Sequence, residues 1–148
     1  MSIEETDPSD VRSATLPGDS DFMLSFLTSM SNKMGFEIGI RLFIGGSAIS
    51  GTLIGGQQYF TELSKQTNPT GDDSNPAAQA LSNVFDEMVS FYTAETNEED
   101  HSTPPSFIHL KEAWTYTPGQ TPLLVGLWRG RVARVDGWAL GTYGQSEK

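Results

Sequence analysis

The chain has 148 residues and a formal net charge of -10, with 9 Lys and Arg residues against 19 Asp and Glu residues. This length favours a single domain, and a surface this negative repels phosphate backbones, which disfavours nucleic acid as a partner. The sequence contains no cysteine, which excludes disulfides, thiolate metal sites and cysteine nucleophiles.

The first 19 residues differ in composition from the rest of the chain. They are acidic, contain two prolines and carry few apolar residues, so they predict a disordered acidic tail. The start also lacks the basic and apolar regions of a secretory signal. We therefore expect a cytoplasmic protein with a tail at residues 1–19 and one globular domain at residues 20–143. Residues 38–56 contain too many glycines and serines to predict a membrane span.

Three segments show the spacing of amphipathic helices. Apolar residues recur every three or four positions over residues 21–33, 57–66 and 76–92. Ser20 is the expected N-cap of the first helix, and Gly35 is its expected C-terminal stop.

Five segments have the composition or alternation of β-strands: residues 36–44, 47–54, 107–117, 123–129 and 131–140. A Gly-Gly pair between the first two predicts a hairpin, and Gly51 predicts a bulge or a sharp bend. We expect a tight bend at Gly130 and a meander of the last three strands. Together the elements predict an α+β fold, in which a strongly bent antiparallel five-stranded sheet forms a small Sm-like barrel. The barrel would carry an N-terminal helix and a helical, acidic insertion at about residues 57–106.

Candidate catalytic and metal-binding residues are few. His109 and Glu112 would point to opposite faces of a strand, which disfavours a shared metal or acid–base site and favours an ordinary strand role for His109. The glycine-rich residues 45–56 lack the ending of a phosphate-binding loop. We therefore expect no enzyme activity, no metal and no cofactor.

The most unusual segment is residues 128–138, which read WRGRVARVDGW and hold three of the nine basic residues. Aromatic and arginine side chains are enriched at binding hot spots. This pattern favours a partner-binding patch made of Trp128, Arg129, Arg131, Arg134 and Trp138. The alternative is a strand whose tryptophans fill the core and whose arginines are solvated.

The charge pattern along the chain suggests how copies could meet. No Lys or Arg lies between Lys65 and Lys111, whereas eight acidic residues do. Such blocks permit contacts between the arginine segment of one copy and the acidic stretch of another, while the net charge keeps copies apart.

Four short motifs, in order, resemble the U-type gas vesicle accessory proteins. They are the strand start at Gly35, the ISGTLI and YF pair at residues 49–60, FIHLK at residues 107–111, and WRGRVARVDGW followed by Leu140 and Gly141. The resemblance covers about residues 35–142. It implies a non-enzymatic cytoplasmic protein, associated with gas vesicles, that self-associates as a homo-oligomer and binds the vesicle shell or other gas vesicle proteins. Its expected role is in vesicle assembly or vesicle clustering.

A more distant resemblance is to Sm-like RNA-binding rings, whose two sequence blocks are similar to Gly51-x-Leu53 and to the Arg129-Gly130 region. Gln57 stands where the Sm pattern has an acidic residue, and the asparagine that follows in that family is missing. The likeness therefore implies the fold and a ring-like oligomer rather than RNA binding. A nucleic-acid-binding ring that uses Arg129, Arg131 and Arg134 is the alternative function.

Overall fold

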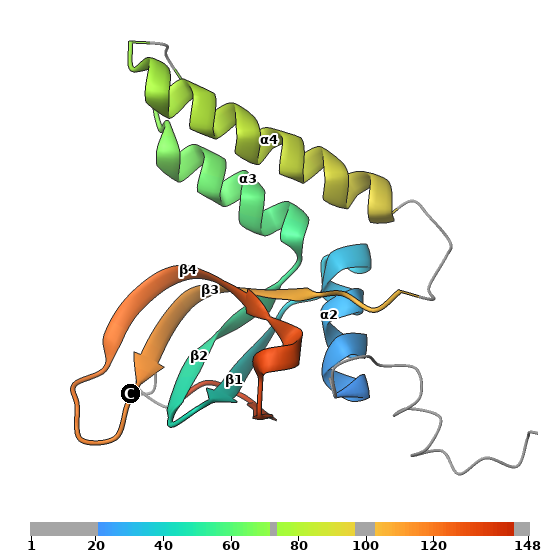
Figure 1. The fold of residues 1–148 in the computed structure, drawn as a ribbon, viewed down its shortest axis with the longest axis vertical. Coiled ribbons are helices and arrows are strands. Elements are labelled where there is room, and N and C mark those ends of the chain that lie inside the picture. The colour runs from blue at the N-terminus through green and yellow to red at the C-terminus, as the bar shows by residue number, and fades with distance from the viewer. Residues whose placement is uncertain (1–20, 72–73, 97–102, 144–148) are drawn as a thin grey trace, which may run out of the picture.

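The structure, a computed structural model, describes residues 21–71, 74–96 and 103–143, and the predicted tail at residues 1–19 lies outside them. The described residues form an α+β fold with three α-helices and one five-stranded antiparallel sheet (Figure 1). The strands are β1 (Ile38–Ile44), β2 (Ser47–Ile54), β3 (Phe107–Tyr116), β4 (Leu123–Arg131) and β5 (Gly137–Leu140). Their order across the sheet is β4-β3-β2-β1-β5.

Helix α2 (Phe22–Met34) confirms the first predicted helix to within one residue at each end. Its N-cap is Asp21 rather than Ser20, because the Asp21 carboxylate accepts a hydrogen bond from the amide of Met23 at 2.9 Å. Gly35 ends the helix with a left-handed backbone (φ 71°), a conformation that glycine adopts without steric cost.

The sheet is open, so the predicted barrel is not confirmed. β4 and β5 are its two edge strands and do not pair within the described part of the chain. The predicted meander is wrong, because β5 leaves β4 and pairs with β1 at the opposite edge, where Arg41 faces Ala139. The prediction of a tight bend at Gly130 is also wrong. β4 continues through Gly130, which pairs with Ile108, and the chain turns one residue later in the 3-10 helix η2 (Val132–Arg134).

Two irregularities bend β3 against its neighbours. The pairing of β2 with β3 shifts register around Gly51, which confirms the predicted bulge, and a Cβ at Gly51 would lie only 2.9 Å from the Lys111 carbonyl oxygen. The pairing of β3 with β4 shifts between Leu110 and Ala113. As a result Ala113 follows Leu110 on the core side of the strand, and Trp114 lies outside that core.

One face of the sheet packs against α2 and forms the main core. Its buried members come from α2, β1, β2, β3 and η2: Leu24, Ile40, Leu42, Ile49, Leu53, Ile108, Leu110, Ala113 and Val132. Trp128, Val135 and Trp138 pack against this cluster. Burial of these apolar side chains is the largest favourable contribution to folding.

The opposite face carries the predicted helical segment between β2 and β3. Helices α3 (Gly56–Thr67) and α4 (Pro76–Thr96) pack side by side and project from one end of the sheet (Figure 1). Pro76 occupies the first helical position, where its missing N–H costs nothing. A second cluster joins the pair to the sheet through Ile54, Tyr59, Phe60 and Tyr92. The two helices therefore cover only part of this face.

Gly56 is required where α3 leaves the sheet, because a Cβ there would lie 2.5 Å from the Tyr92 ring. We predict that Gly56→Ala lowers the free energy of unfolding by about 1–3 kcal/mol, the usual range for overpacking. Gly46→Ala is the matched control, since a Cβ at Gly46 meets no atom within 4 Å. Urea denaturation of both variants checks this, and equal stability of the two would show that Tyr92 can move aside.

Candidate functional site: a basic corner and an open groove

The predicted patch at residues 128–138 is divided between the two faces of the sheet. Consecutive strand residues point to opposite faces. Trp128 accordingly packs against the α2-side core, whereas Leu127 packs against the cluster under α3 and α4. Trp138 also joins the α2-side core, and its Nε1 donates a 2.6 Å hydrogen bond to the Asp21 carboxylate. Both tryptophans therefore have structural contacts within the chain.

Arg129 is enclosed by aromatic side chains under α3 and α4. Its guanidinium carbon lies 3.7 Å from the centre of the Phe107 ring and 5.3 Å from that of Phe60, which are cation–π distances. Its Nη1 lies 2.9 Å from His109 Nε2 and 3.4 Å from the Tyr92 hydroxyl. Arg129 thus joins β4 to β3, α3 and α4, and it is not free to bind a partner.

His109 is fully buried beside Arg129, among the rings of Tyr59, Phe60 and Tyr92. Burial, and secondly the nearby positive charge of Arg129, lower the pKa of His109 to about 3. The ring is therefore neutral at physiological pH, and its Nε2 accepts from the Arg129 guanidinium, which places the remaining proton on Nδ1. Nδ1 has no hydrogen-bond partner among the described residues. This arrangement gives His109 a packing role, as the sequence favoured.

Arg131 and Arg134 lie at the surface where β4 ends and η2 turns the chain. Both side chains are exposed, and neither forms an ion pair or hydrogen bond with the described residues. Ala133 between them is exposed as well. We call Arg131, Ala133 and Arg134 the basic corner. Of the five residues predicted to bind a partner, these two arginines are the pair whose charged groups are available.

An open groove of about 800 Å³ lies on the part of the sheet face that α3 and α4 leave uncovered. Successive turns of α3 form one wall with Gln58, Glu62 and Gln66. The rest of the lining comes mainly from the sheet, including Gly51, Thr52, Lys111, Glu112, Trp114, Leu124, Gly126 and Leu127. The groove thus combines amide and carboxylate groups with an apolar side.

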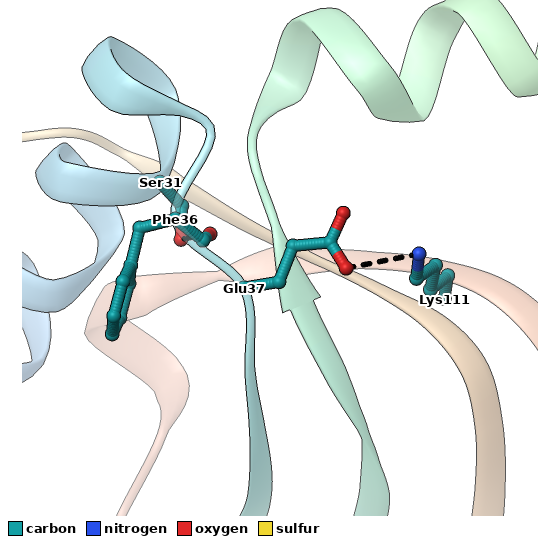
Figure 2. Close-up of polar contacts among 4 residues, drawn as sticks. All are labelled: Ser31, Phe36, Glu37 and Lys111. Carbon is teal, nitrogen blue, oxygen red and sulfur yellow. Dashed lines mark hydrogen bonds and ion pairs between the residues drawn. The ribbon is translucent and has the colours of Figure 1, made fainter.

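The positive charge in the groove is already paired. Lys111 Nζ lies 3.0 Å from Glu37 Oε1, as Figure 2 shows, and both side chains are partly exposed. The segment that carries Glu37 is held to α2 by a 2.6 Å hydrogen bond from the Ser31 hydroxyl to the Phe36 carbonyl oxygen. Glu62 and Glu112, which are exposed, have no such cation beside them in the described structure. The groove consequently offers net negative charge.

Glu112 has an unusual backbone. Its φ of 54° is the only positive φ of a non-glycine residue in the described ranges, and it lies at the β3 bulge. Strained residues of this kind cost about 1–3 kcal/mol and cluster at ligand-binding sites. The sequence does not predict this left-handed conformation, because Gly, Asn and Asp are the residues that usually adopt it.

The described residues contain neither a cluster of metal ligands nor a helix that could span a membrane. Among the residues that the structure describes, no three His, Asp or Glu side chains come close enough together to hold a metal ion. Within the same ranges, each helix is too short or too polar to span a lipid bilayer.

The fold and site define a small acidic α+β protein with two oppositely charged exposed features, a basic corner and an acidic groove. A family model described as "Gas vesicle protein GvpU-like" matches residues 21–143. The chain therefore belongs to this family of gas vesicle proteins, as the ordered motifs indicated. No curated protein and no solved structure matches the chain.

Proposed function

We propose that this chain is a non-enzymatic gas vesicle accessory protein that self-associates and binds vesicle shell protein, and so controls the assembly or clustering of gas vesicles. Its membership of the GvpU-like family supports the gas vesicle context. On this proposal the protein works in the cytoplasm as a homo-oligomer on the vesicle surface, without a cofactor.

The exposed arginine pair is the observation that carries the binding role. Arg131 and Arg134 have no counter-ions among the described residues, on a chain whose net charge is -10. Uncompensated cations on an otherwise negative surface attract acidic partners and orient them during encounter. The nucleic-acid alternative is weaker, because one of its three arginines, Arg129, is enclosed by Phe107, Phe60 and His109.

Binding to vesicles can be measured by flotation, since gas-filled vesicles rise when centrifuged and free protein does not. We expect R131A/R134A to lower the affinity for isolated gas vesicles by about tenfold, as for the loss of a binding hot spot. K33A/K65A is the matched control, because it removes the same charge from the ends of α2 and α3. Unchanged flotation of R131A/R134A, with both variants folded, would show that the corner is only a solvated surface.

A further inference from the structure

The basic corner and the acidic groove lie at opposite ends of the same strand. Leu124 and Gly126, near the start of β4, line the groove, whereas Arg131 is its last residue. With a rise of about 3.3 Å per residue, roughly 20 Å of strand separates Leu124 from Arg131. Figure 1 shows this strand curving away from the β3–β4 hairpin towards η2 and α2. This separation disfavours a contact between the corner and the groove of the same copy.

The two features are complementary in charge and in polarity. The corner presents two guanidinium groups with Ala133 between them, and the groove presents Glu62 and Glu112 beside the apolar side chains of Trp114 and Leu124. Leu124 is 64% exposed, so it has apolar surface left to cover. Guanidinium groups pair well with carboxylates and stack on aromatic rings.

We propose that the groove of one copy receives the basic corner of a second copy, so that Glu62 and Glu112 pair with Arg131 and Arg134. This inference rests on the proposed self-association and names the two surfaces that produce it. The contact is heterologous, because different surfaces of each copy meet. Such contacts repeat from copy to copy and give rings or open chains. Each chain thus offers one donor surface and one acceptor surface.

The acceptor differs from the acidic stretch that the sequence suggested. That stretch includes Asp86 and Glu87, which lie on exposed positions of α4 outside the groove. The groove adds what an exposed acidic pair lacks, namely a concave surface with apolar area and a strained residue, Glu112. Substitutions in the two places can therefore distinguish them.

The groove variant E62Q/E112N provides the sharpest test by sedimentation velocity over a concentration series at pH 7.5. It makes the net charge less negative, so general electrostatics alone would strengthen association. Our proposal requires the opposite, a weakening of self-association by about tenfold or more. Asn is used at position 112 because it tolerates a positive φ. D86N/E87Q, with the same charge change, should associate at least as strongly as wild type.

Mixing two variants tests the heterologous geometry directly. R131A/R134A keeps its groove, and E62Q/E112N keeps its corner. Each alone should remain monomeric where wild type forms larger species, whereas an equimolar mixture should form a 1:1 dimer that cannot grow. A mixture that stays monomeric, or an E62Q/E112N variant that assembles like wild type, would overturn the inference.

Two outcomes separate this inference from the proposed function. If wild type remains monomeric at every concentration, both fail. If E62Q/E112N assembles normally but no longer floats with gas vesicles, the groove takes shell protein rather than a second copy. In that case the inference fails and the proposed function stands.

Discussion

Replacing Arg129 by alanine should lower the free energy of unfolding by about 2–4 kcal/mol, whereas Arg131→Ala should change it by less than about 0.5 kcal/mol. Arg129 stacks on Phe107 and Phe60 and donates towards His109 and Tyr92, and a cation–π contact contributes about 0.5–2 kcal/mol, more as it is desolvated. The substitution also leaves His109 Nε2 without its partner in a buried position. Arg131 loses no such contact, because its side chain is exposed.

Urea denaturation of the two single variants provides the measurement. If Arg129→Ala were as stable as Arg131→Ala, the guanidinium would be solvated rather than enclosed. The result also decides how binding should be tested. A variant lacking all three arginines would lose association through unfolding, so Arg129 must stay intact when the basic corner is removed.

The free energy of unfolding should also depend strongly on pH, because His109 is buried in its neutral form. Its pKa is about 3 in the folded chain, against about 6.5 for an unfolded chain. Because the folded state holds the ring neutral, this stabilisation is complete above pH 6.5 and is lost as the pH falls towards 3. The loss is about 1.4 kcal/mol per pH unit, or about 2 kcal/mol between pH 6.5 and pH 5.

His109→Gln isolates this contribution, because glutamine can still accept a hydrogen bond from Arg129 but does not titrate in this range. We expect the difference in unfolding free energy between wild type and His109→Gln to shrink steadily from pH 7 to pH 5. Titrations of the carboxylates are common to both proteins and cancel in the difference. Parallel stability curves would contradict the neutral, buried state of His109. Association should accordingly be measured near pH 7.5, where the loss of His109 stabilisation does not intervene.

Local sequence patterns predicted most of the elements because each has a strong signal within a few residues. The helix at Phe22–Met34 combines apolar periodicity with a glycine stop, and the β1–β2 hairpin combines alternation with a Gly-Gly turn. The crossing of β5 to β1 has no such signal, since β5 has four residues and the turn before it reads Val-Ala-Arg. β5 pairs with β1, which lies far from it in the sequence, so no local pattern predicts this pairing.

The candidate site was predicted only in part, for a similar reason. The sequence showed that the 128–138 segment is rich in arginine and tryptophan, and it left open whether these residues form a binding patch or a strand with buried tryptophans and solvated arginines. The sequence could not show that α3 and α4 fold back over Arg129 and leave Arg131 exposed. The groove arises from residues on α3, β2, β3 and β4, so no local pattern describes it.

On the proposed function, the protein links gas vesicles to one another by binding them and by binding itself. Dynamic light scattering of isolated gas vesicles, titrated with the purified protein at pH 7.5, measures this linking. We expect the apparent particle size to rise with added wild-type protein and to stay near its starting value with R131A/R134A. A wild-type protein that floats with the vesicles but leaves their size unchanged at every ratio would contradict it.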